Sequence, residues 1–162
     1  MKLRHARTAD VPDICALINQ YAEKGLMLHR SHESVYDTLR EFLVAEDDGE
    51  LLGCCAVDIV WSNLAEVKSL AVSPAARGRG VGSALVSEGM EQARQLGVER
   101  FFALTYEQRF FEKLGFGVVD RHMLPDKVWR ECIACPKADH CDEIAVLYEP
   151  TATENGPERR YQ

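Results

Sequence analysis

The sequence is short of basic residues: 19 Lys and Arg stand against 26 Asp and Glu, a formal net charge of −7 at pH 7. Nucleic-acid backbones are bound by extended basic faces, so this balance argues against nucleic acid as the main partner. Long hydrophobic runs are also lacking, and no stretch approaches the roughly 20 apolar residues of a membrane span. Residues 1–7 are charged and contain no apolar core of a secretion signal. We therefore expect a cytoplasmic protein with no membrane contact.

Internal repeats and low-complexity segments are missing as well. What remains is ordinary for a globular domain: 162 residues, 46% hydrophobic and 28% charged. We expect one domain over residues 1–149, followed by a flexible polar tail over residues 150–162 that contains proline and glycine.

Periodicity predicts alternating strands and helices along this domain. A short strand (residues 3–7) precedes a helix with apolar residues at helical spacing up to Ala22 and a stop at Gly25. A second helix is expected over residues 32–41 after Ser31, and a third over residues 81–96. The remaining expected elements are strands at 42–46, 51–61, 64–72, 101–105, 116–119 and 144–148, and a short helix at 109–114. This order predicts a mixed α/β fold around one central sheet.

The most informative segment joins the strand at 64–72 to the third helix. It reads Arg77-Gly78-Arg79-Gly80-Val81-Gly82, with three glycines at alternate positions beside two arginines. Backbone N–H groups at a helix N-terminus favour an anion. The segment therefore predicts capture of a pyrophosphate rather than a plain glycine-rich turn.

Two common phosphate loops do not fit this segment. A P-loop needs a lysine after its last glycine, and a dinucleotide fingerprint needs Gly-x-Gly-x-x-Gly at the start of a βαβ unit. The observed order, Arg-x-x-Gly-x-Gly after a strand ending in Val-Ser-Pro, resembles the coenzyme A loop of the GNAT N-acetyltransferase family. A second element, Phe110-Phe111-Glu112-Lys113-Leu114-Gly115-Phe116, resembles the family's segment after the fifth strand.

The resemblance implies the GNAT fold, acetyl-CoA as co-substrate and a donor site along the strand and loop. The main-chain N–H of Leu70 is the implied ligand of the thioester carbonyl. The complete implied set of cofactor-binding residues is Leu70, Ala71, Val72, Arg77, Gly78, Arg79, Gly80, Val81, Gly82, Ser83 and Phe111.

Acetyl transfer to a protonated amine needs a base for the amine and an acid for the leaving sulfur. Glu66, at the start of the donor strand, stands where the family often carries its base. Tyr106 follows the strand at 101–105, where the family often carries a proton donor. The plain alternatives are a solvated carboxylate and a half-buried tyrosine.

The acceptor side is indicated by two further resemblances. The segment Leu26-Met27-Leu28-His29-Arg30-Ser31 is similar to the Leu-x-x-Arg-Ser element of bacterial N-acetylglutamate synthases, in which the arginine binds a substrate carboxylate. The segment at residues 124–145 resembles the C-terminal signature of the short, stand-alone synthases. Arg30 and Lys127 are thus candidate carboxylate ligands, and Lys68 is another basic residue on the donor strand. Each of the three could equally be a solvated cation.

Three cysteines, Cys132, Cys135 and Cys141, lie beside His140 and could supply zinc ligands. Their spacing differs from a paired Cys-x2-Cys finger, so we prefer a metal-free loop with reduced thiols, the usual state of cytosolic cysteines.

The predicted function is acetyl-CoA-dependent N-acetylation of a small-molecule amino acid at its α-amino group, with L-glutamate, the first step of arginine biosynthesis, as the implied acceptor. The alternatives are glutamine, another small amine, a protein N-terminus, or a non-catalytic acetyl-CoA sensor. The resemblance also allows a homodimer.

Overall fold

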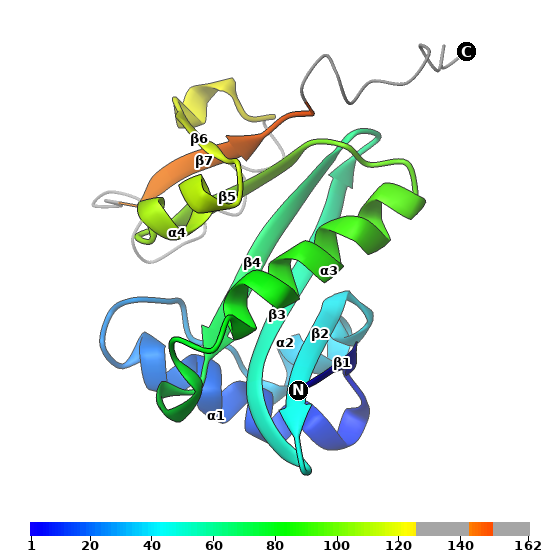
Figure 1. Cartoon of the computed structure of the whole chain (residues 1–162), viewed down its shortest axis with the longest axis vertical. Coiled ribbons are helices and arrows are strands. Elements are labelled where there is room, and N and C mark those ends of the chain that lie inside the picture. Colours follow the sequence, from blue (N-terminus) through cyan, green and yellow to red (C-terminus); the bar gives the residue numbers. More distant parts are fainter. Residues whose placement is uncertain (126–142, 151–162) are drawn as a thin grey trace.

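A computed structural model describes residues 1–125 and 143–150. Seven strands form one sheet in the order β1-β2-β3-β4-β5-β7-β6 (Figure 1). Their bounds are Lys2–His5 (β1), Phe42–Asp47 (β2), Glu50–Trp61 (β3), Leu64–Val72 (β4), Phe101–Thr105 (β5), Gly117–Val119 (β6) and Ile144–Tyr148 (β7). All neighbours are antiparallel except β4 and β5. The expected mixed α/β fold with one central sheet is confirmed.

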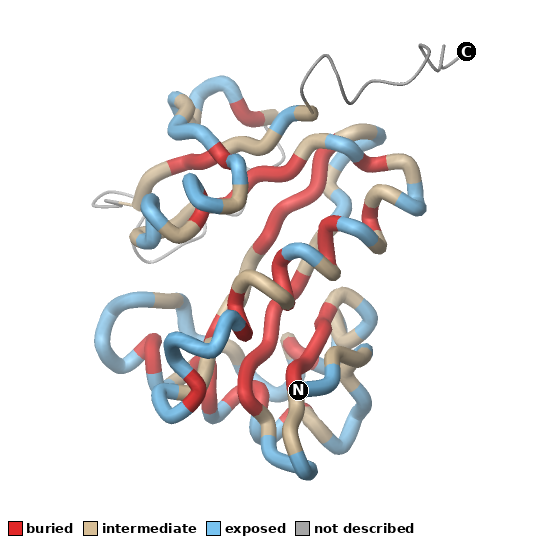
Figure 2. Tube along the Cα trace, viewed as in Figure 1, coloured by how far each residue is buried: buried red, intermediate tan, exposed pale blue. Residues whose placement is uncertain are grey.

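Helices cover both faces of this sheet. Side chains of α3 (Val81–Gln95) pack with Leu43, Ala45 and Cys55 in one core cluster. Side chains of α1 (Val11–Ala22) and α2 (His32–Asp37) pack with Phe42, Val44 and Cys54 in another. Because neighbouring strand residues point to opposite faces, β2 and β3 serve both cores, and Figure 2 shows their middle sections buried. The short helix α4 (Gln108–Lys113) follows β5.

The second helix is shorter than the sequence predicts. It was expected over residues 32–41, but α2 ends at Asp37 and a 3-10 turn follows at Leu39–Glu41. The hydroxyl of Thr38 donates to the Ser34 carbonyl at 2.8 Å, a local bond that competes with helix continuation. The expected N-cap is confirmed, since the Ser31 side chain accepts from the Ser34 N–H.

Strand β4 carries an irregularity that decides which side chains reach the site. Lys68 lies opposite Ala56 and Ala71 opposite Cys54, so the single residue Cys55 faces two residues of β4. This is a β-bulge. Its effect is visible in the packing: Val67 belongs to the α3 core, whereas Ala71, an even number of residues later, belongs to the α1 core.

Strands β4 and β5 pair over a short distance only. Their register comprises Ala65 with Phe101 and Glu66 with Phe102, and beyond these pairs the strands diverge (Figure 1). The remainder of β4 is therefore not covered by β5 on that edge. Because both strands run in the same direction, the opening lies at their carboxyl ends, where α/β proteins commonly bind ligands.

Candidate functional site

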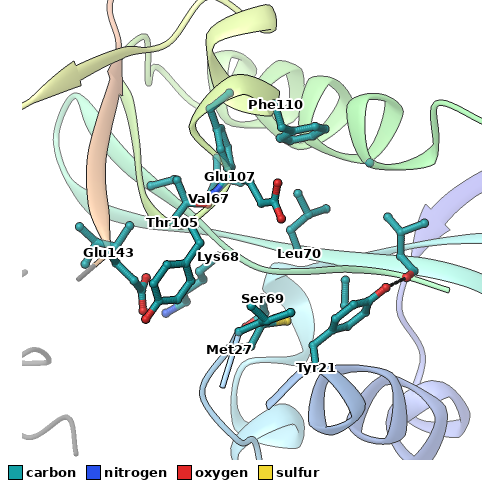
Figure 3. Close-up of a pocket in the computed structure, with 18 of the residues that line it drawn as sticks. Tyr21, Met27, Val67, Lys68, Ser69, Leu70, Thr105, Glu107, Phe110 and Glu143 are labelled. Atoms are coloured by element: carbon teal, nitrogen blue, oxygen red, sulfur yellow. Dashed lines mark hydrogen bonds between the residues drawn. The ribbon is translucent and has the colours of Figure 1, made fainter. Parts of the chain in front are cut away.

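A cavity of about 500 Å³ fills the space where β4 and β5 separate. Figure 3 shows side chains entering it from β4, from the end of β5, from the start of α4 and from the α1 side. Its wall includes Glu66, Leu70, Thr105 and Tyr106, together with residues of the segment that joins α1 to α2. The site is thus bounded by elements far apart in sequence.

The predicted donor residues fall into two groups in space. Leu70, Ala71, Val72, Arg77, Gly82 and Phe111 line the cavity itself. Gly78, Arg79, Gly80, Val81 and Ser83 lie in the loop and first turn of α3. Gly78 and Gly80 have φ values of 78° and 76°, a region that favours glycine. The first helical bond joins the Ala84 N–H to the Gly80 carbonyl at 3.0 Å, so the N–H groups of the first turn are oriented outward for an anion.

The two arginines of this loop bond protein groups. Arg77 donates to the hydroxyl of Tyr21 at 3.3 Å through Nε and at 3.1 Å through Nη2. The same hydroxyl donates to the carbonyl of Val72. Arg79 pairs with Asp47 at 3.2 Å on the exposed surface, where such pairs contribute little to stability.

The two neighbouring phenylalanines of α4, Phe110 and Phe111, differ in burial and in contacts. Phe111 is only 3% exposed and packs edge-on against Phe116 in the α3 core. Phe110 is half-buried and lies over Gly82, where a Cβ would come within 3.3 Å of its ring. Both rings line the cavity, and the predicted donor set contains Phe111 but not Phe110. The helical periodicity of a single turn does not separate the two.

The candidate base is held inside the protein. Glu66 is 7% exposed, lies opposite Asp58 of β3, pairs with Phe102 of β5 and lines the cavity. Tyr106, the candidate acid, is half-buried and lines the same cavity. The structure thus brings both predicted catalytic residues to one cavity. Glu66 enters it from β4, and Tyr106 enters it from the end of β5.

Cations gather at the α1–α2 end of the cavity. Lys68 Nζ lies 3.2 Å from Asp58. The carboxyl group of Glu41 interacts with the same Asp58, and its burial together with that neighbouring carboxylate raises the pKa of Glu41 above its ordinary value. Arg30 lies over the Phe42 ring and donates to Ser34, Thr38 and Ser69. Four of its five N–H donors are bonded in this way. Two expected carboxylate ligands, Arg30 and Lys68, therefore line one cavity.

Several sequence-predicted residues lie outside the described ranges. These are Lys127 and the three candidate zinc ligands, Cys132, Cys135 and Cys141. Over residues 1–125 and 143–150, no group of three or more His, Cys, Asp or Glu side chains is arranged to hold a metal. In the same ranges, no helix has the length and apolar character needed to cross a membrane.

Comparison with known proteins identifies the family. The model of the acetyltransferase (GNAT) family matches residues 11–116, more than half of the chain. The chain belongs to the GNAT acetyltransferase family. The family, the fold and the enzyme class predicted from the loop and the Phe110–Phe116 element are therefore confirmed.

Two curated relatives cover most of this GNAT chain. An uncharacterized N-acetyltransferase of Chlorobaculum tepidum is 39% identical over 90% of this chain and 94% of its own. An amino-acid acetyltransferase of Mycobacterium tuberculosis is 38% identical over 80% of this chain and 75% of its own. A third relative, an amino-acid acetyltransferase of Neisseria meningitidis, is 37% identical, but the match covers only 29% of that protein.

Two solved structures resemble this GNAT chain closely. A Mycobacterium tuberculosis protein crystallised in complex with CoA has a TM-score of 0.80, 31% identity and coverage of 93% of this chain and 100% of that one. The N-acetylglutamate synthase of Neisseria gonorrhoeae, complexed with coenzyme A and N-acetyl-glutamate, has a TM-score of 0.83 and 31% identity. The match covers 91% of this chain and 34% of the synthase.

Proposed function

We propose that this enzyme transfers the acetyl group of acetyl-CoA to the α-amino group of an amino acid, with L-glutamate as its principal acceptor. Acetyl-CoA is the donor, since the two solved relatives hold CoA on the same fold. Curated relatives named amino-acid acetyltransferases support the acceptor class. The arginine-biosynthetic role is part of the proposal and follows from the choice of glutamate.

The observation that carries the proposal is the arrangement of the cavity. The strand opening exposes the end of β4 beside the N-terminus of α3, and it places a buried carboxylate, Glu66, on the wall. Arg30 and Lys68 stand at the end away from α3, next to the α1–α2 segment. A thioester laid along β4 and an anionic amino acid at the cations would meet between them, which is the positioning that acyl transfer needs.

The proposed reaction is an addition to the thioester followed by loss of the thiolate. The unprotonated α-amine attacks the thioester carbonyl, whose oxygen is stabilised by the N–H of Leu70. A proton of the amine passes to Glu66, directly or through water, as the C–N bond forms. The C–S bond then breaks, and Tyr106 gives a proton to the departing thiolate. Products are the N-acetyl amino acid and CoA, and solvent restores both side chains.

The carboxylates of the acceptor are proposed to bind at the end of the cavity that holds Arg30 and Lys68. L-glutamate brings two carboxylates, and three residues are proposed to bind them: Arg30, Lys68 and Lys127. Glutamine, with one carboxylate and an amide, would use the same site with one charged contact fewer. A hydrogen bond between charged groups is worth about 1.5–3 kcal/mol, so the two acceptors are expected to differ by at least tenfold in kcat/KM.

The test is a thiol-release assay with acetyl-CoA and a panel of acceptors: L-glutamate, L-glutamine, other amino acids, a polyamine and a peptide. The proposal predicts the highest kcat/KM with L-glutamate. Highest turnover with glutamine would replace the acceptor but keep the class. Turnover only with the polyamine or the peptide, or binding of acetyl-CoA with no turnover, would overturn the proposal.

A further inference from the structure

Ser69 adopts a backbone conformation that serine seldom takes. Its φ is 54°, in the left-handed region that is unfavourable for a residue with a Cβ. Among the described non-glycine residues, only Asp48 shares a positive φ, and Asp48 lies in the turn between β2 and β3. Ser69 instead lies within a strand, at the bulge of β4. Such strain persists where surrounding contacts enforce it, frequently at functional sites.

The bulge places two consecutive side chains on the acceptor side of the sheet. Lys68 reaches Asp58, and the hydroxyl of Ser69 contacts Arg30 in the α1–α2 segment. In a regular strand, neighbours would point to opposite faces. Both residues line the cavity, and Figure 3 shows Ser69 beside Met27, next to Leu70 in the strand.

The contact with Arg30 leaves the hydroxyl hydrogen of Ser69 available. Arg30 Nη1 lies 3.0 Å from Ser69 Oγ. An arginine only donates, so the serine oxygen accepts here and its own hydrogen remains to be donated. No acceptor for that hydrogen is found among the described residues. Arg30 is itself immobilised by Ser34, Thr38 and the Phe42 ring, so the hydroxyl has a fixed position.

The guanidinium beside this hydroxyl is hydrogen-bonded to uncharged groups. The hydrogen-bond acceptors of Arg30 are neutral: two hydroxyls besides that of Ser69, and one carbonyl. Its positive charge is therefore not met by a directly bonded carboxylate within residues 1–125 and 143–150. A hydroxyl that accepts from a guanidinium is a stronger donor, because hydrogen bonds polarise one another.

We propose that the Ser69 hydroxyl, held by Arg30, donates a hydrogen bond to the α-carboxylate of the acceptor. Arg30 then also positions the Ser69 hydroxyl, in addition to the contact with an acceptor carboxylate proposed above. This inference rests on the proposed function and adds a specificity determinant to it. In an α-amino acid the carboxylate is two bonds from the amine nitrogen. A carboxylate at Ser69 therefore sets the amine beside Leu70, whose N–H is the proposed ligand of the thioester carbonyl.

The test uses Ser69→Gly and Ser69→Ala. Both remove the hydroxyl, but glycine also relieves the positive φ, so the first variant separates lost function from lost folding. We expect the acceptor KM to rise about tenfold in both, with the KM for acetyl-CoA unchanged within about twofold. The preference for the amino acid over its α-carboxamide should fall by about tenfold. Ser87→Ala, on the exposed side of α3, is the matched control and should leave all three values unchanged.

The outcomes separate the two proposals. If the wild-type enzyme acetylates an amino acid and both Ser69 variants keep its acceptor KM and its preference over the α-carboxamide, the role of Ser69 is overturned and the proposed function stands. A loss of kcat alone, with the preference retained, also overturns it, because that pattern indicates a structural role. A wild-type enzyme that acetylates no amino acid overturns both proposals.

Discussion

The guanidinium of Arg77 lies over the ring of Tyr21, with 5.4 Å between the Arg77 Cζ atom and the ring centroid, and its Nη2 atom donates to the tyrosine hydroxyl at 3.1 Å. The same hydroxyl donates to the carbonyl of Val72. Tyr21 belongs to α1, Val72 ends β4 and Arg77 belongs to the loop before α3. One hydroxyl therefore connects α1 to two points of the proposed donor site.

Tyr21→Phe removes that hydroxyl and keeps the ring beneath Arg77. We expect the Kd for acetyl-CoA to rise about fivefold, since each lost hydrogen bond is worth roughly 1 kcal/mol and the loop must then be ordered on binding. Calorimetric titration with acetyl-CoA measures this. Tyr36→Phe, on an exposed tyrosine outside the cavity, is the control. Tighter binding by Tyr21→Phe would show instead that Tyr21 competes with the cofactor for Arg77.

The Tyr21 contact illustrates what a sequence of this kind does not reveal. Strand β4 and the start of α3 were predicted to the residue, because an apolar strand ends at Ser73-Pro74 and glycines mark the helix start. Arg77 was predicted as an anion ligand on the same local grounds. That its side chain bonds a residue 56 positions earlier depends on the sheet order, and no local pattern encodes that order.

Gly89→Ala tests the close approach of α3 to the sheet. A Cβ at Gly89 would lie 2.6 Å from Cγ2 of Val57, so the helix must shift away from β3. Overpacking of this kind costs about 1–3 kcal/mol, and we expect the melting temperature to fall by about 3–10 °C. A thermal melt followed by circular dichroism measures it.

The control for this substitution is Gly117→Ala, where a Cβ would meet nothing within 4 Å. Its melting temperature should stay close to that of the wild type. Val57→Ala should restore part of the loss when combined with Gly89→Ala, because it removes the methyl group that clashes. A Gly89→Ala protein with the melting temperature of the wild type would mean that β3 can move away from α3 without loss of stability.

The bulge at Ser69 shows a second limit of prediction. Positive φ is usually signalled by glycine, asparagine or aspartate, and the segment Val67-Lys68-Ser69-Leu70 carries none of these. A regular strand over residues 64–72 would place Ser69 on the α3 side, together with Val67. Arg30 was predicted to bind a carboxylate directly. Its bonds to Ser34, Thr38 and Ser69 could not be foreseen, because they require the bulge and the early end of α2.

Asp10→Asn tests the ion pair that joins Arg4 of β1 to Asp10, the residue before α1. Asp10 accepts from Arg4 at 2.7 and 2.8 Å, and both side chains are mostly buried. The hydrogen bond from Arg4 holds the pKa of Asp10 below its ordinary value. The stabilisation is therefore complete above the unfolded-state pKa of about 3.9 and is lost as the pH falls through the lower folded-state pKa.

We expect Asp10→Asn to lower the free energy of unfolding by about 1–2 kcal/mol at pH 7. Below pH 4 the difference from the wild type should shrink, because the Asp10 carboxyl of the unfolded wild-type chain then takes up a proton, which favours unfolding. Urea unfolding at pH 7 and pH 3 measures both values. Asp48→Asn, in an exposed turn where asparagine tolerates the positive φ, is the matched control. A difference that persists unchanged at pH 3 would contradict the ion-pair explanation.

Glu66→Gln tests the proposed base while keeping the shape of a side chain that is only 7% exposed. Glutamine cannot take the proton of the amine, so we expect kcat to fall by about 10²–10⁴-fold. Binding of acetyl-CoA should persist, because the proposed donor contacts begin at Leu70. Glu99→Gln, an exposed residue of the loop before β5, should retain wild-type rates. If Glu66→Gln keeps kcat within about threefold, another group accepts the proton, and Glu66 is a structural carboxylate opposite Asp58.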